Sequence, residues 1–174
     1  MFAMKNLSKG IVAGVLIIVI VLAIGLYYYE SYGYVRFYIS DPGNNSYAQI
    51  YLTISSIMIH STNKGWITVS NKTQTIALSS TPQLLTSTTI PSGNYTEVRF
   101  VVESVTIQLL NNINVSANLP SNVFKIAIPG GLLISPGRTT YVTISLGPHI
   151  TETGNGEYIL RPLIAVTTSN SPPS

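Results

Sequence analysis

The feature that most constrains this chain is an uninterrupted apolar run from Gly10 to Tyr29. It holds no polar side chain before its three closing tyrosines, so it lacks the polar stripe of a helix packed on a soluble domain. A helix of about 20 residues is roughly 30 Å long, which matches the hydrocarbon core of a bilayer. The run predicts a transmembrane or signal helix over residues 10–29, after a basic cytoplasmic segment, residues 1–9, that contains Lys5 and Lys9.

The apolar run has three interpretations. As a retained anchor, it places the tyrosines in an aromatic belt at the outer interface and leaves the lysines in the cytoplasm. As a secretory signal peptide, it is cut between Gly25 and Leu26, after the small-x-small triplet Ala23-Ile24-Gly25. As a prepilin-like leader, it is cut at Lys9-Gly10, which resembles the site before the apolar helix of archaeal pilins. All three place the rest of the chain outside the cytoplasm.

Charged side chains are scarce, at 9% of residues against roughly 25% in an ordinary soluble protein. The basic residues do not cluster, so the sequence shows no patch of the kind that binds nucleic acid. The lack of cysteine excludes disulfides, thiolate metal sites and cysteine nucleophiles. The few carboxylates and histidines are scattered, so we predict no metal, no cofactor and no nucleic-acid partner.

Beyond the apolar run, the sequence has the patterns of strands and turns. Residues 34–40 alternate, with Val35, Phe37 and Ile39 on one face, which is the period of a half-buried strand. No later segment shows a sustained helical period. The remainder is therefore expected to be all β.

Two longer strands are expected over residues 48–61 and 95–110, and each changes phase once. The first change predicts a β-bulge near Ser55-Ser56. Gly, Pro and Asn turns between short strands favour an antiparallel β-sandwich, Ig-like or prealbumin-like, over residues 33–166. The remaining boundaries are a linker at 30–32, a last strand at 157–166 and a disordered tail at 167–174.

Several motifs follow one another in an order that resembles a known family. They are Gly33-x-Val35-x-Phe37-x-Ile39-x-Asp41-Pro42, Ile50-Tyr51-Leu52-Thr53-Ile54, Ile90-Pro91-Ser92-Gly93-Asn94-Tyr95, Pro129-Gly130 and Tyr158-Ile159-Leu160-Arg161-Pro162. The series resembles the domain-of-unknown-function 4382 family over about residues 33–166. The resemblance implies an exported β-sandwich and brings no catalytic residues to carry over.

The layout of the chain also resembles archaeal thread filament subunits, which assemble by donor-strand exchange. A strand headed by the tyrosines after cleavage at Gly25, or the strand at 34–40, would then pair with a neighbouring subunit. The expected donor side chains are Tyr27, Tyr28, Tyr29, Val35, Phe37 and Ile39.

Catalytic and binding side chains are few. Asp41 with His60 or His149 supplies two members of a Ser–His–Asp triad, but no serine lies in a nucleophile-elbow motif, so we predict no enzyme. Trp66 is expected to fill the core, with a carbohydrate-stacking platform as the alternative. Glu97, Arg99 and Glu103 lie on one strand, with Glu97 and Arg99 on the same face, and are expected to form a solvated set of cross-strand ion pairs.

Four asparagines in Asn-x-Ser/Thr triplets are candidate N-glycosylation sites in the exterior part. They are Asn44, Asn71, Asn94 and Asn114.

Together these features predict a non-enzymatic structural or adhesive protein of the cell surface, in one version a filament subunit. The alternative is a membrane-anchored module that binds a carbohydrate, a peptide or a partner protein. The expected partners are the membrane and further copies of the chain or other surface-layer proteins. The expected location is the outer side of the cell membrane, with the N-terminus in the cytoplasm, or a surface filament after cleavage.

Overall fold

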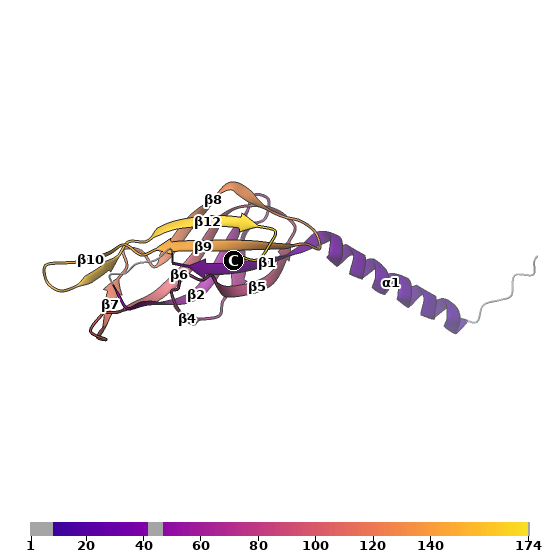
Figure 1. Ribbon diagram of the computed structural model, residues 1–174. Helices are drawn as coiled ribbons and strands as arrows, with labels where there is room; N and C mark the ends of the chain where they lie inside the picture. Colours follow the sequence, from indigo (N-terminus) through magenta and orange to yellow (C-terminus); the bar gives the residue numbers. More distant parts are fainter. Residues whose placement is uncertain (1–8, 42–46, 174) are drawn as a thin grey trace, which may run out of the picture.

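The computed structural model describes residues 9–41 and 47–173 (Figure 1). A single helix, α1 (Lys9–Ser31), projects from one end of a two-layered β-domain. The helix carries apolar side chains all round and none of its span from Gly10 to Ser31 is buried. The helix is long and apolar enough to cross a membrane. A signal sequence near the N-terminus can have the same length and composition. The predicted N-terminal apolar helix is confirmed.

The smaller sheet has four strands in the order β12-β9-β1-β5. Its first strand in the chain, β1, is flanked on both sides, parallel to β9 and antiparallel to β5. Since β12 is antiparallel to β9, β12 runs back toward α1. The bounds are β1 Tyr32–Ser40, β5 Gln83–Pro91, β9 Thr139–Gly147 and β12 Leu163–Ser169.

The larger sheet has eight strands built on two long ones, which pair antiparallel along nearly their whole length. These are β2 (Gln49–Ser61) and β6 (Gly93–Gln108). Two shorter strands flank each: β3 (Gly65–Ser70) and β4 (Gln74–Ala77) lie along β2, and β7 (Asn114–Asn118) and β8 (Val123–Ile134) lie along β6. The sheet ends beyond β7 with β11 (Tyr158–Leu160) and β10 (Ile150–Glu152), farthest from α1.

A β-bulge in β2 keeps both halves of this long strand facing the core. The register with β6 shifts between Ile54 and Ser56, so Ser55 is the extra residue. Ile54 and Ile57 are consequently both buried although three positions separate them. The bulge predicted from the phase change is confirmed.

The two sheets pack face to face around one apolar core. Each contributes alternate side chains, such as Val35, Phe37 and Ile39 from β1. Phe100 and Phe124 meet edge to face in this core, with ring centroids 5.1 Å apart. The all-β sandwich predicted from the turn spacing is confirmed, but it is not wholly antiparallel, because β1 pairs parallel with β9 and β11 pairs parallel with β7.

Three predicted boundaries are wrong. No linker separates helix and sandwich, because α1 extends to Ser31 and β1 begins at Tyr32. The last strand is broken around Pro162, which has no N–H to donate, and the chain crosses there from β11 in one sheet to β12 in the other. The predicted disordered tail is ordered as far as Ser169, because β12 finds backbone partners in β9.

Tyr95, at the start of β6, joins the core to the preceding turn. Its ring is fully buried and its hydroxyl donates to the Pro91 carbonyl at 2.6 Å, as in the tyrosine corner of immunoglobulin-type sandwiches. Burial raises the pKa of the Tyr95 hydroxyl above its usual value. The neutral phenol is therefore the form that the fold favours.

This raised pKa predicts a loss of stability in alkali. The unfolded chain loses the Tyr95 proton first, from about pH 10. The free energy of unfolding should be unaffected by this group below that pH and fall above it, up to the folded-state pKa. Tyr95→Phe should flatten the decline, measured by denaturant titration across pH, whereas Tyr34→Phe, at an exposed position, should keep it. An identical alkaline decline in the Tyr95→Phe variant would contradict this assignment.

Candidate functional site

The junction between α1 and β1 is bonded to two turns of the sandwich. The Ser92 N–H and hydroxyl both donate to the Ser31 carbonyl, at 2.8 and 3.1 Å. On the other side, the Gly137 N–H donates to the Tyr32 carbonyl at 2.9 Å, and the Tyr34 N–H donates to the Arg138 carbonyl at 2.8 Å. The two bonds from Ser92 satisfy the last carbonyl of the helix, which has no partner within α1. The end of α1 is thus part of the folded domain.

Tyr29 reaches back from α1 onto the turn between β8 and β9. Gly137 in this turn has a φ of +63°, and a Cβ added to it would lie 2.5–2.9 Å from the Tyr29 ring and hydroxyl. The backbone at this position favours glycine, and a side chain there would also push the far end of the Tyr29 ring away. In the sequence, Gly137 stands out only as a turn residue, because nothing local indicates that Tyr29 packs on it.

Gly137→Ala is expected to destabilise the sandwich and to loosen Tyr29. The left-handed backbone alone costs about 1–2 kcal/mol for a residue with a Cβ, and displacement of the ring adds to this. Gly156→Ala is the matched control, since Gly156 has a φ of +82° and open space around it. We expect a larger fall in the free energy of unfolding, and faster hydrogen exchange at the end of α1, in the Gly137 variant. Equal effects would show that Tyr29 does not depend on this glycine.

A groove of about 510 Å³ opens beside this junction. Four tyrosines dominate its lining, and none of the lining residues is charged. Within it, the rings of Tyr28 and Tyr32 are stacked, with centroids 5.3 Å apart. The lining residues are Gly25, Tyr28, Tyr29, Tyr32, Tyr34, Thr89 and Gly137.

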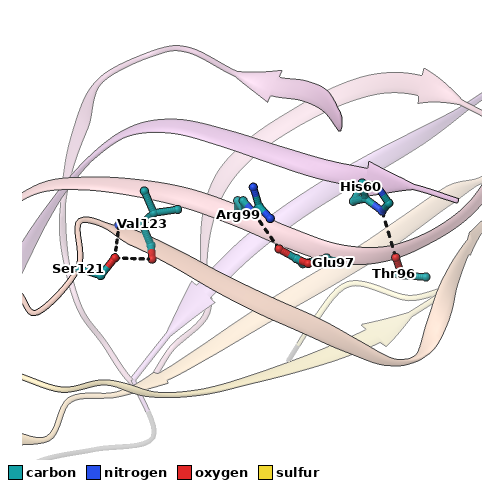
Figure 2. A network of polar contacts seen from close by, with 6 residues as sticks. All are labelled: His60, Thr96, Glu97, Arg99, Ser121 and Val123. Atoms are coloured by element: carbon teal, nitrogen blue, oxygen red, sulfur yellow. Dashed lines mark hydrogen bonds and ion pairs between the residues drawn. The ribbon is translucent and has the colours of Figure 1, made fainter. Parts of the chain in front are cut away.

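A second candidate site lies on the outer face of the larger sheet, here called the Trp66 platform: His60, Trp66, Thr96, Glu97 and Arg99. Trp66 lies opposite His60 in the β2–β3 ladder, with ring centroids 4.9 Å apart. The Arg99 guanidinium carbon lies 3.8 Å from the Trp66 ring centroid, a cation–π contact. The Arg99 Nε donates to Glu97 Oε1 at 2.8 Å, so the ion pair lies within β6, whereas the sequence suggested pairs between strands (Figure 2).

The expected core position of Trp66 is wrong. Trp66 is half-buried, whereas Val69, three residues on, is in the core and Ile67 packs against it. Strand alternation therefore puts Trp66 and Thr68 on the outer face. The size of the tryptophan side chain suggested burial, but the alternation along β3 places it on the outer face of the sheet.

A bulge in β6 completes the platform. Ser61 pairs with Tyr95 and His60 with Glu97, so Thr96 is an extra residue against β2. On the β8 side the same step from Tyr95 to Glu97 faces Leu132 to Ala127, so there the extra residues lie on β8. The Thr96 hydroxyl lies 3.4 Å from His60 Nδ1 (Figure 2). The platform thus combines an aromatic ring with donors and acceptors on a sheet surface, which suits stacking and hydrogen bonding.

The expected donor-strand residues fall into two groups. Tyr27, Tyr28 and Tyr29 lie in the last turns of α1, while Val35, Phe37 and Ile39 face the core of their own sandwich from β1.

The candidate catalytic residues do not form one constellation. Asp41 follows β1 and lines a small pocket with Ile50 near the start of β2. His60 lies near the other end of β2, roughly 30 Å away along the strand. His149, between β9 and β10, is exposed, and its carbonyl accepts from the Arg161 N–H at 2.8 Å. Among the described residues, no group of three or more His, Asp and Glu side chains could hold a metal ion.

Three of the four candidate glycosylation sites have exposed side chains. Asn71 follows β3, Asn94 lies near the start of β6, and Asn114 opens β7. Asn44 lies outside the described residues.

One comparison with known proteins gives a match. A family model described as Domain of unknown function (DUF4382) matches residues 32–162, from the first residue of β1 to the break before β12. Neither the curated proteins nor the solved structures contain a match to this chain.

Proposed function

Since the chain belongs to the DUF4382 family and carries an exposed apolar helix directly before its sandwich, we propose that it is a non-enzymatic structural or adhesive protein of the cell surface. In this proposal α1 is retained as a membrane anchor, and the sandwich stands on the outer side of the membrane.

The direct continuation of α1 into β1 carries the proposal. A flexible linker would let a tethered domain tumble, whereas here Ser31 ends the helix and Tyr32 begins a strand held on both sides in its sheet. The bonds of Ser31 and Tyr32 to Ser92 and Gly137 fix the helix end further. A rigid connection of this kind between helix and sandwich suits a protein that transmits or resists force at a surface.

Protease treatment of intact cells that carry the full chain tests the location. The protease must be unable to cross the membrane. We expect the protease to digest the sandwich on intact cells. In a sample without protease, we expect the full chain to sediment with the membranes. Protection of the sandwich until the cells are lysed would contradict the proposal, because the domain would then lie in the cytoplasm.

The filament version of the proposal uses β1 as the exchanged strand. Its side chains Val35, Phe37 and Ile39 are 0%, 0% and 1% exposed, so β1 carries the alternating anchors that a donor strand needs. If the β1 strand of a neighbouring copy lay between β5 and β9 in place of the chain's own β1, it would make the same contacts. Cysteines at Val35 and Thr140, which are register partners on the adjacent strands β1 and β9, test this version. A crosslink between two chains supports exchange, and a crosslink confined to single chains contradicts it.

A second candidate function is carbohydrate binding at the Trp66 platform, favoured by the half-buried position of Trp66 beside Arg99 and Glu97. Trp66→Ala should weaken binding to a saccharide found by array screening by roughly tenfold or more. Tyr141→Ala is the matched control, since Arg36 lies 6.0 Å from the ring of Tyr141 on the other sheet. Equal affinity of the Trp66→Ala variant and the unchanged chain would exclude the platform.

A further inference from the structure

Five tyrosines surround the junction of α1 and β1 and are here called the tyrosine collar: Tyr27, Tyr28, Tyr29, Tyr32 and Tyr34. The three in α1 are 60–66% exposed, and Tyr34 in β1 is 50% exposed. Tyr27 and Tyr28 meet edge to face with centroids 6.3 Å apart, and Tyr28 stacks on Tyr32. A cluster of large exposed rings marks a surface that has a partner.

The position of the collar along α1 indicates that this partner is the membrane. From Gly10 to Leu26 the helix is about 25 Å long, close to the thickness of the hydrocarbon core. From Tyr27 to Ser31 it covers roughly 7 Å more, about the depth of one headgroup layer. With α1 across a bilayer, the collar lies among the headgroups and the sandwich begins at their outer boundary.

The chemistry of the collar groove selects the kind of headgroup. Its lining offers aromatic faces, phenol hydroxyls and one threonine hydroxyl, with no charged side chain. Arg138 follows Gly137 and is exposed, but it is not among the lining residues. A phosphate calls for cationic donors, whereas a sugar ring packs its C–H face on aromatic rings and exchanges hydrogen bonds with hydroxyls.

We propose that the tyrosine collar is a lipid-binding site that seats an uncharged glycosyl headgroup of the membrane that α1 crosses. The inference rests on the proposed anchoring by α1. The seated headgroup contacts both α1 and β1, because Tyr28 and Tyr29 come from the helix and Tyr32 and Tyr34 from the strand. It thereby holds the sandwich in one orientation on the membrane.

Lipid retention in nanodiscs tests this site with the full chain. The nanodiscs contain phosphatidylcholine with a minor fraction of monoglucosyl diacylglycerol and an equal fraction of phosphatidylglycerol. Native mass spectrometry of the released protein identifies the lipid that stays bound. We expect the glucosyl lipid to be enriched about tenfold over its share of the bilayer, a difference of ~1.4 kcal/mol in binding free energy.

Two double variants show whether the enrichment comes from the collar. Tyr28→Ala with Tyr32→Ala should abolish it. Tyr38→Ala with Tyr141→Ala, which removes another tyrosine pair with centroids 6.3 Å apart on the sandwich, should leave it unchanged. Enrichment of phosphatidylglycerol instead, enrichment of neither lipid, or equal enrichment in both double variants would overturn the inference. Failure of the chain to enter nanodiscs would overturn the proposed anchoring itself, which is a separate and visible outcome.

Discussion

Phe37→Ala is expected to lower the free energy of unfolding by roughly 3–5 kcal/mol. Phe37 is fully buried and lies midway along β1, which occupies an inner position of the smaller sheet. Truncation removes a large apolar surface and leaves a cavity that strands on both sides prevent from closing. The measurement is denaturant unfolding of the full chain in detergent, followed by the loss of the sheet signal in circular dichroism.

Tyr34→Ala is the matched control for this prediction. Tyr34 lies on the same strand but half exposed, so its truncation should cost less than about 1 kcal/mol. If both variants unfolded at the same denaturant concentration, β1 would not be an integral strand of its own sandwich.

Resistance to force should depend strongly on the direction of pulling. Tension between α1 and the far end of the sandwich acts along β1, and its ladders with β5 and β9 then carry the force together in shear. Tension between α1 and the end of β12 acts at one end of the domain, since β12 runs back toward α1. It then opens the β9–β12 ladder one pair at a time. We expect a several-fold higher rupture force in the first geometry.

Single-molecule pulling through engineered cysteines measures this difference, and the natural chain contains no cysteine to interfere. Glu30→Cys serves as one handle in both experiments. Gly154→Cys, near the β10–β11 turn, is the second handle in shear, and Asn170→Cys, just after β12, is the second handle for unzipping. Equal rupture forces in the two geometries would show that the continuity of α1 and β1 has no mechanical consequence.

Much of the fold follows from local patterns in the sequence. The unbroken apolar run sets α1, because no other arrangement accommodates so many adjacent apolar side chains. The alternation at Val35, Phe37 and Ile39 places β1 with one face in the core. The phase change at Ser55 locates the bulge, since an extra residue is the means by which a long strand keeps both halves apolar on one side.

The candidate sites depend on pairings that no local pattern contains. The parallel neighbour of β1 is β9, which begins about a hundred residues later in the chain. Tyr29 contacts Gly137 because the pairing of β1 with β9 brings the turn before β9 to the end of α1. Arg99 reaches Trp66 only because β2 lies between β3 and β6.

The most direct test of the account is the mass of the protein extracted from its native membrane, together with its N-terminal residue. A membrane-anchored sandwich must keep the apolar part of α1, because among the described residues this helix alone is long and apolar enough to cross a bilayer. We therefore expect a membrane-bound chain that still contains Gly10 to Ser31. A chain that begins at Leu26, after cleavage at Gly25, would contradict it and favour a released subunit.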